Sequence, residues 1–414
     1  MLLDSIHSPA DVRALPEGQL PQLCQELREF LVKSVSKTGG HLASNLGAVE
    51  LTVAIHRVFD TERDRLVFDV GHQCYVHKML TGRREQFATL RQLDGLSGFP
   101  KPHESVHDAF IAGHASNSVS VALGMARART LGGEDYRVLA LIGDGALTGG
   151  LAYEGLNNAG ASGEPLIVIL NDNGMSINLN VGAMPSHLAR LRSRPGYYHF
   201  KKWYRSLFGP RPMKNPLYRF NHKVKTFLKR SLFPGSTLFE DMGFTYLGPV
   251  DGHDLPRLCD ALRWARELDC PVVVHVNTVK GRGCAFAERN PDMYHGVGPF
   301  DPETGLLKKA GEESFSSVFG KALADFARED ARGCAITAAM ADGTGLSGFA
   351  KTFPDRFFDV GIAEGQGVSM AAGMAAQGLL PVFAVYSTFL QRGYDMLIHD
   401  VALEKLHVVL GVDR

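Results

Sequence analysis

The chain lacks the features that would place it in a membrane, in the secretory pathway or around a structural zinc ion. Its 414 residues contain 44 basic and 44 acidic side chains, so net charge indicates neither a nucleic-acid nor a membrane partner. No apolar run is long enough to span a bilayer, and charges and prolines interrupt Met1–Arg28, where a signal peptide needs an unbroken apolar stretch. No Cys-x-x-Cys pair occurs, so we expect reduced thiols in a cytoplasmic protein at Cys24, Cys74, Cys259, Cys270, Cys284 and Cys334.

One long stretch lacks acidic side chains altogether. No Asp or Glu lies between Asp172 and Glu240, while Lys and Arg recur there among aromatic residues such as Tyr197 and Trp203. By itself this pattern is compatible with an RNA-binding or membrane-surface segment. Because the rest of the chain balances the charge, we favour a mobile basic insertion at about 183–238 that covers an active-site mouth and attracts anionic substrates.

The strongest pattern present is a strand–helix–strand unit. Val138–Ile142 and Leu166–Leu170 are unbroken apolar runs of the kind that form buried parallel strands, and the residues between them indicate a crossover helix. Each run ends in a polar cluster, the first in Gly143-Asp144-Gly145 and the second in Asn171-Asp172-Asn173. Since ligands of open parallel sheets bind where strands end, both clusters are expected at one point.

The residue types in these clusters favour a magnesium and phosphate site. The Asp144 carboxylate, the Asn173 side-chain oxygen and the Met175 carbonyl are hard ligands that suit Mg²⁺ together with diphosphate oxygens. The N–H groups of Gly145 and Ala146 at a helix start suit a phosphate. Taken singly, either cluster is equally a turn or a helix cap, but their position on successive strand ends favours the metal. A nicotinamide site is a weaker alternative because no Gly-x-Gly-x-x-Gly follows a strand.

Alternation of strands and helices continues through the chain and predicts an α/β fold with two doubly wound parallel-sheet domains, the second incomplete. We place the first domain at 1–300, a linker containing Pro and Gly at 301–316, and the second domain at 317–414. Further strands are expected at Arg65–Val70, Phe357–Ile362 and Pro381–Tyr386. One long helix is expected at Phe389–Glu404.

Three loops before the strand–helix–strand unit carry histidines. His41 lies in the Gly-rich loop Gly39–Gly47, His72 follows a strand, and His114 precedes a helix of small residues. A lone loop histidine is usually a hydrogen-bonding surface group. Three of them at the ends of α/β elements in one domain favour a shared pocket in which they move protons near neutral pH.

Several motifs resemble those of thiamine diphosphate enzymes. The two polar clusters have the spacing of the thiamine diphosphate signature. A closer resemblance, to the 1-deoxy-D-xylulose-5-phosphate synthase family of transketolase-like enzymes, covers essentially the whole chain. The matching segments are Gly39–Gly47, Asp69–Lys78, Leu80–Arg84, Leu96–Lys101, Leu147–Gly150, Asn178–Gly182, Gly248–Asp254 and Lys280–Gly283.

The resemblance implies thiamine diphosphate and Mg²⁺ as cofactors and assigns roles to residues. The implied catalytic residues are Glu364, which would act on the aminopyrimidine ring, and His41, His72 and His295. The implied cofactor contacts are His72, Gly113, His114, Ala115, Gly145, Ala146, Asn173, Lys280, Glu364 and Phe389. The implied substrate contacts are His41, Tyr386 and Arg392. From the residues alone, Glu364 is equally a first-turn glutamate favoured by the helix dipole, and a solvent-facing loop position is the favoured interpretation of His295.

The resemblance also implies a reaction and an assembly. Pyruvate and glyceraldehyde 3-phosphate would condense with loss of carbon dioxide to 1-deoxy-D-xylulose 5-phosphate, which feeds isoprenoid, thiamine and pyridoxal synthesis. The expected assembly is a homodimer, without nucleic acid or membrane.

Two departures from the family pattern leave alternatives open. Gln366 stands where the family usually has a histidine after the catalytic glutamate. Family members also continue well beyond Arg414, so we expect a truncated chain. The alternatives are a catalytically incomplete cofactor-binding subunit that needs a partner chain and, less favoured, a nucleic-acid-binding module that uses the basic insertion.

Overall fold

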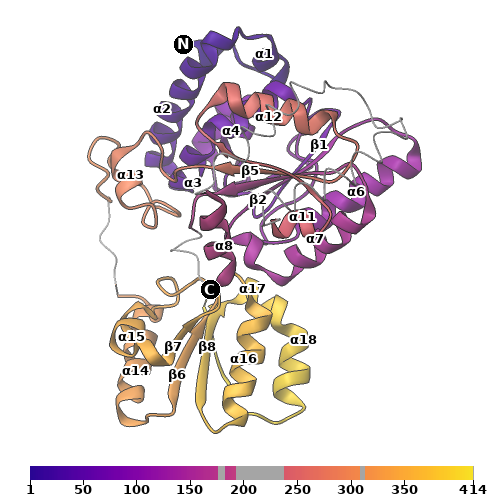
Figure 1. Ribbon diagram of the computed structural model, residues 1–414. Coiled ribbons are helices and arrows are strands. Elements are labelled where there is room, and N and C mark those ends of the chain that lie inside the picture. The colour runs from indigo at the N-terminus through magenta and orange to yellow at the C-terminus, as the bar shows by residue number, and fades with distance from the viewer. Residues whose placement is uncertain (176–181, 193–236, 308–312, 414) are drawn as a thin grey trace.

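The computed structural model describes residues 1–175, 182–192, 237–307 and 313–413. Within these ranges the chain forms two parallel β-sheets in two lobes (Figure 1), each sheet covered by helices on both faces. The predicted α/β class with two doubly wound domains is therefore confirmed. No helix in the described ranges combines the length and apolarity that a bilayer crossing requires. Most of the predicted basic insertion lies outside the described residues.

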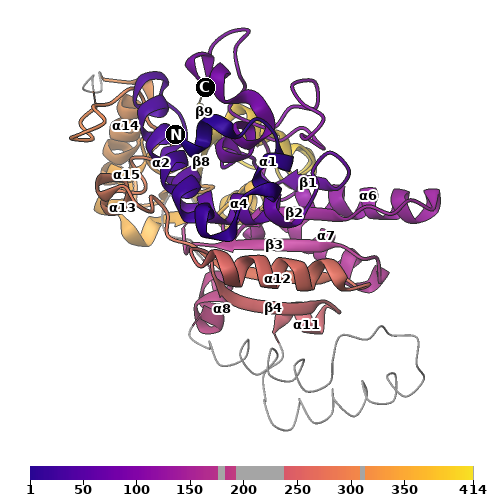
Figure 2. The ribbon, with the colours of Figure 1, turned by 90° about the horizontal axis from the view of Figure 1, so that it is seen from above.

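The first sheet has five strands in the order β1-β2-β3-β5-β4, all parallel. Figure 2 shows β1 and β2 beside the N-terminal helices and β4 at the opposite edge. The strands are β1 (Arg65–Phe68), β2 (Val138–Gly143), β3 (Ile167–Asp172), β4 (Thr245–Asp251) and β5 (Val272–Asn277).

Both faces of this sheet are buried because its strands are mostly apolar, with the polar residues mainly at the strand ends. Along β2, Leu139 and Leu141 point into one hydrophobic core, and Ala140 and Ile142 point into the other. This two-residue alternation is what a pleated strand between two helical layers requires. The continuous apolar runs in the sequence therefore mark strands covered on both sides.

Helices of the first domain lie on the two faces. One core includes residues of α2 (Leu20–Thr38), α4 (Val49–Val58) and α12 (Leu255–Glu267). The other includes residues of α6 (Ser118–Gly132), α7 (Gly150–Ser162), α8 (Ala183–Arg192) and α11 (Leu238–Asp241). Shorter helices are α1 (Pro9–Ala14), α3 (Leu42–Gly47), α5 (Tyr75–Lys78) and α13 (Ala285–Arg289).

The second sheet has four parallel strands in the order β7-β6-β8-β9. They are β6 (Gly333–Thr337), β7 (Phe357–Asp359), β8 (Leu380–Tyr386) and β9 (Val409–Asp413). The helices around them are α14 (Phe315–Glu329), α15 (Ser347–Thr352), α16 (Glu364–Ala376), α17 (Ser387–Leu390) and α18 (Tyr394–Met396).

Three local expectations differ from the structure. Part of the expected Gly-rich loop is helix α3. Strand β7 ends at Asp359, three residues early, because Gly361 turns the chain with a φ of +71°. The single helix expected at Phe389–Glu404 is broken into short α, 3₁₀ and π segments. Gly393 lies within it, where an added Cβ would come within 2.8 Å of Val368, so close packing against α16 requires the glycine.

Candidate functional site

The polar clusters after β2 and β3 meet at the carboxyl edge of the first sheet. Asp144 is 2% exposed, and its Oδ2 accepts the N–H of Gly174 at 2.7 Å. The N–H of Asn173 also points at this carboxylate. The Asn173 Oδ1 in turn accepts the N–H of Met175 at 3.1 Å. The structure thus brings together the three residues that the sequence proposed as metal ligands.

A second carboxylate lies beside Asp144. Burial, and then the neighbouring charge of Asp172, raise the pKa of Asp144 to about 8. The Asp172 Oδ2 is held by Nε2 of His275 at 2.8 Å, and the other nitrogen of that ring pairs with the Tyr246 hydroxyl at 2.7 Å. Because His275 stabilises the charge on Asp172, Asp144 is the group of the pair that takes up a proton when no cation is bound.

Lys280 supplies positive charge next to this edge. The side chain is 5% exposed, and it interacts electrostatically with Asp144 and Asp292. Burial lowers the pKa of Lys280 to about 8, although those two carboxylates oppose the shift. Its charge therefore changes in the same pH range as that of Asp144.

Two of the three loop histidines predicted to share a pocket, His41 and His72, cluster with His295, while the ring of the third, His114, contacts Phe389 of the second domain. The cluster of His41, His72 and His295 is called here the histidine pocket. The ring centroids of His41 and His72 are 5.4 Å apart, those of His41 and His295 5.7 Å, and those of His72 and His295 5.0 Å. Burial lowers the pKa of His41 to about 4 and holds the pKa values of the other two well below the ordinary value. All three rings are therefore neutral at pH 7, and each has one nitrogen that donates and one that accepts.

Asn45 holds this pocket together, and the sequence analysis did not single it out. Its side-chain Nδ2 donates to the carbonyls of His41 at 2.6 Å and His72 at 2.8 Å, while its Oδ1 accepts the N–H of Tyr75 at 2.8 Å. Both N–H groups of this fully buried amide are therefore used on the two histidine loops, and its oxygen is used on the start of α5. The cue in the sequence was a polar side chain within the Gly-rich stretch, part of which forms α3.

Asp69 orders the loop that carries His114 and Ala115. The Asp69 carboxylate, 1% exposed, accepts the N–H groups of Ser116 at 2.6 Å and Ser118 at 3.1 Å. The Ser116 hydroxyl donates to the carbonyl of Ala146 at 2.7 Å, which connects this loop to the end of β2. The Gly145–Ala146 turn and the His114 loop are therefore fixed relative to one another.

The second domain meets the first at this loop. Arg392 donates a hydrogen bond to the carbonyl of Ala115, and the Phe389 ring meets the His114 ring edge-on at 5.8 Å. Tyr386 stacks on Phe389 with 6.0 Å between centroids. The residues predicted from the second half of the chain therefore face those of the first across the gap between the domains.

Glu364 lies on the same side of the second domain. It is the first residue of α16 and is 3% exposed. Burial raises the pKa of Glu364, and the charge of Arg392 opposes that shift. A carboxyl group that readily keeps its proton is therefore present beside the inter-domain contact.

Two further observations indicate that the gap accommodates a polar ligand. Nδ1 of His72 and Nδ1 of His114 are buried and have no hydrogen-bond partner among the described residues. Beside Gly113 the space is open, since a Cβ added there would meet no atom within 4 Å. A group of three or more His, Cys, Asp or Glu side chains able to hold a metal does not occur in the described ranges.

Two parallel-sheet domains with such a site define the chain as a transketolase-like α/β protein. The solved transketolase of Campylobacter jejuni subsp. jejuni NCTC 11168 matches 96% of this chain and 69% of its own chain, with a TM-score of 0.51 and 18% identity, a likeness of fold. The chain belongs to the 1-deoxy-D-xylulose-5-phosphate synthase family. That family's model matches residues 3–278, and the model described as "Transketolase, pyrimidine binding domain" matches residues 312–414.

Two curated relatives agree with this assignment. The chain is 54% identical over 415 residues to 1-deoxy-D-xylulose-5-phosphate synthase of Caldanaerobacter subterraneus subsp. tengcongensis, and 56% identical over 414 residues to that of Desulforudis audaxviator. Each alignment covers 100% of this chain, but only 66% and 65% of the respective relative. The chain therefore spans about two thirds of the length of the relatives it matches.

Proposed function

We propose that this chain forms the cofactor-binding part of a 1-deoxy-D-xylulose-5-phosphate synthase that condenses pyruvate with glyceraldehyde 3-phosphate. The observation that carries the proposal is the meeting of two groups of residues across the domain gap. Phe389 and Arg392 of the second domain contact the His114 loop of the first, and Glu364 interacts electrostatically with Arg392.

Thiamine diphosphate and Mg²⁺ fit the residues present. Asp144, Asn173 and the Met175 carbonyl would hold the metal, because a carboxylate, an amide and a carbonyl are hard oxygen ligands that leave positions for diphosphate oxygens. A cation there would also relieve the repulsion between Asp144 and Asp172. The N–H groups of Gly145 and Ala146 and the charge of Lys280 would face the diphosphate. This part of the proposal predicts that metal and cofactor bind together.

Bound thiamine diphosphate would supply a carbon nucleophile and hold the electron pair released when carbon dioxide leaves. Glu364 would give and take a proton at a pyrimidine nitrogen, which is consistent with a pKa raised by burial. Phe389 would cover the pyrimidine ring. Gln366, which replaces the usual family histidine, cannot change charge and would contribute only hydrogen bonds.

The histidine pocket would handle the substrates. Neutral His41, His72 and His295 would donate to or accept from substrate hydroxyl and carbonyl oxygens and move a proton between them. Tyr386 and Arg392 would face the substrate from the other domain, and Arg392 would pair with a phosphate or carboxylate after leaving the Ala115 carbonyl.

The activity is tested by incubating the purified chain with both substrates, thiamine diphosphate and Mg²⁺, and measuring release of carbon dioxide and formation of the ketose phosphate. We expect product with the cofactors and none after chelation of the metal. Cofactor binding without product would overturn the claim that the chain is itself active, and product formed only on addition of the remaining part of a relative would favour an incomplete subunit. Lack of cofactor binding would overturn the whole proposal.

The charge of Lys280 should make cofactor affinity pH-dependent. The lysine is charged below its pKa of about 8 and neutral above it, so its attraction for the diphosphate is present at pH 7 and mostly lost at pH 9. The charged fraction falls about tenfold over that range. We therefore expect the dissociation constant of the wild type, relative to that of Lys280→Arg, to rise about tenfold between pH 7 and 9. Calorimetric titration at several pH values measures it, and a constant ratio would contradict it.

A further inference from the structure

A segment that the proposed function does not use packs over the histidine pocket. It comprises residues 97–108 and is called here the 97–108 segment. The Phe99 ring meets the His41 ring at 5.7 Å and 60°. The next residue, Pro100, lies so close to Gly71 that a Cβ there would be 2.5 Å from the proline ring. Phe99 and His41 both remain partly exposed, so the two rings meet near the surface of the protein.

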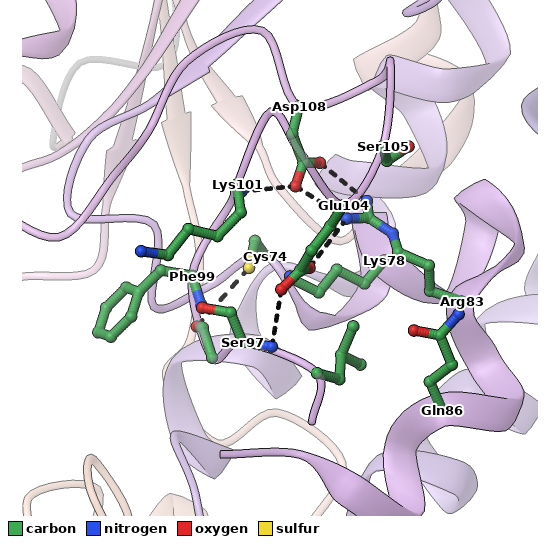
Figure 3. Close-up of polar contacts among 12 residues, drawn as sticks. Cys74, Lys78, Arg83, Gln86, Ser97, Phe99, Lys101, Glu104, Ser105 and Asp108 are labelled. Carbon is green, nitrogen blue, oxygen red and sulfur yellow. Dashed lines mark hydrogen bonds and ion pairs between the residues drawn. The ribbon is translucent and has the colours of Figure 1, made fainter. Parts of the chain in front are cut away.

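Glu104 and Asp108 of this segment pair with Lys78 and Arg83 (Figure 3), and these four largely buried charges are called here the ion network. Lys78 pairs with Glu104, and Arg83 makes two bonds of 2.8 Å to the two oxygens of Asp108. The side chains of Lys78 and Asp108 are fully buried, that of Arg83 is 4% exposed and that of Glu104 15%. Two positive and two negative charges balance within the network, and the fork-like Arg83 contact fixes its geometry.

Each carboxylate of the ion network also holds the backbone beside Phe99. Glu104 accepts the N–H of Ser97 at 2.9 Å, and Asp108 accepts the N–H of Lys101 at 2.7 Å. These two N–H groups lie two residues before and two residues after Phe99 (Figure 3). The backbone that carries the ring is therefore fixed on both sides by groups anchored in the protein interior.

Stability alone is a poor reason for such an arrangement. Removing four charges from water costs free energy, and apolar side chains of similar size often serve a core equally well. What the ion network adds is direction, since each carboxylate has to face both a cation and a particular N–H group. Burial by itself would raise the pKa of Asp108, but hydrogen bonds from His77 and Arg83 outweigh it and hold that pKa well below its ordinary value. Asp108 therefore keeps its charge, and with it its bonds to Arg83 and to the N–H of Lys101, at ordinary pH.

We propose that Phe99 is a specificity-determining wall of the site beside His41, and that the ion network positions it. The wall leaves room beside the imidazole for a small, unbranched aldehyde and keeps water from the ring. The choice of an aldehyde as substrate rests on the proposed function. The statement that Phe99 shields His41 does not.

The first test follows His41 itself and needs neither cofactor nor activity. In the full chain, Phe99→Ala should raise the pKa of His41 toward its ordinary value, because part of its burial is removed. The other groups around that ring, Tyr75, His72 and His295, are unchanged, as are the nearby cations Arg91 and Lys280. Nuclear magnetic resonance of labelled histidines measures the titration. The matched control is Phe326→Ala, which removes an exposed ring on α14 and should leave His41 unchanged. An unchanged pKa of His41 in Phe99→Ala would contradict the proposal that Phe99 shields this ring.

The second test compares two variants of the ion network that differ by one acceptor. The double variant Lys78→Met/Glu104→Gln keeps an oxygen for the N–H of Ser97, so the pKa of His41 should equal that of the wild type. The double variant Lys78→Met/Glu104→Leu, called here the leucine pair, removes that oxygen without leaving an unpaired charge. It should raise the pKa of His41 as Phe99→Ala does. Should the leucine pair fail to fold, Ser97→Ala removes the hydroxyl that accepts the N–H of Phe99 at 3.2 Å and should give a smaller shift in the same direction. Wild-type behaviour of the leucine pair, or of Ser97→Ala in its place, would overturn the positioning role.

The kinetic arm separates positioning from stability. Phe99→Ala should raise KM for the aldehyde about fivefold, the effect of one lost aromatic contact, with little change in kcat. Adding the leucine pair should raise it no further, because the network acts through the same ring. Additive effects would contradict the proposal. If the wild-type chain forms no product, the proposed function fails while the titration of His41 still decides this inference.

Discussion

Glu364→Gln is expected to lower kcat about 10³-fold, the contribution typical of a proton-transferring side chain, while the protein still folds. The amide has the shape of the carboxyl group but cannot exchange a proton with a ring nitrogen. Glu364→Ala should lose at least as much. Steady-state release of carbon dioxide from pyruvate measures the effect, and near-normal turnover of either variant would refute the role of Glu364.

The same substitution should not reduce stability. Burial raises the pKa of Glu364, so the folded state disfavours its charged form, and above the unfolded pKa this opposes folding. Replacing the carboxyl with a neutral amide removes that penalty, so Tm at pH 7 to 8 should stay constant or rise. The matched control is Glu329→Gln, an exposed glutamate at the end of α14, which should change neither kcat nor Tm. A large fall in Tm for Glu364→Gln would instead indicate a structural role.

Asp144→Asn is expected to weaken Mg²⁺ binding at least about 100-fold, because it removes the only charged ligand of the proposed site. The wild-type carboxyl has a pKa of about 8 without metal, raised by burial and by Asp172. Mg²⁺ therefore has to displace a proton at pH 7, and its affinity should increase as the pH rises to about 8.

Calorimetry in two buffers of different ionisation enthalpy measures both effects. The wild type should release close to one proton for each Mg²⁺ bound at pH 7, and the asparagine variant should release none. The control is Asp301→Asn, an exposed loop carboxylate far along the chain, which should bind metal normally. Unchanged Mg²⁺ affinity in Asp144→Asn, or binding of Mg²⁺ to the wild type without proton release, would contradict the assignment of Asp144 as a metal ligand.

Much of the fold could be predicted because burial on both faces leaves a plain mark in the sequence. The run Val138–Ile142 became β2, and Val382 and Ala384 in the later run lie in one core of the second domain while Phe383 and Val385 lie in the other. Short and interrupted elements were harder. The close approach of Val368, from another helix, to Gly393 is a contact that no local pattern records.

For the site, the sequence succeeded where topology alone brings residues together. Asp144 and Asn173 end neighbouring parallel strands, so their proximity follows from strand order, and the structure brings them together. Their roles, and those of Glu364 and the three histidines, remain predictions. The basic stretch could not be compared over 193–236, which lies outside the described residues, although Leu188 of α8 is buried in a core.

The residues that hold the site were not predictable in this way. Asn45 touches segments 27 and 30 residues away, and Phe99 meets His41 because carboxylates later in the chain pin its backbone. Such contacts depend on where loops cross in space.

By itself, the sequence determined the α/β class, because periodic burial is recorded locally along the chain, and its motifs carried the resemblance to the family. The alternation of strands and helices also predicted that the two polar clusters lie at one edge of the sheet. Tertiary structure alone decided which histidine rings share a pocket, which buried carboxyl keeps a proton and which loop covers His41. Those properties arise from desolvation and from hydrogen bonds between distant segments, whose energies exist only once the chain has folded.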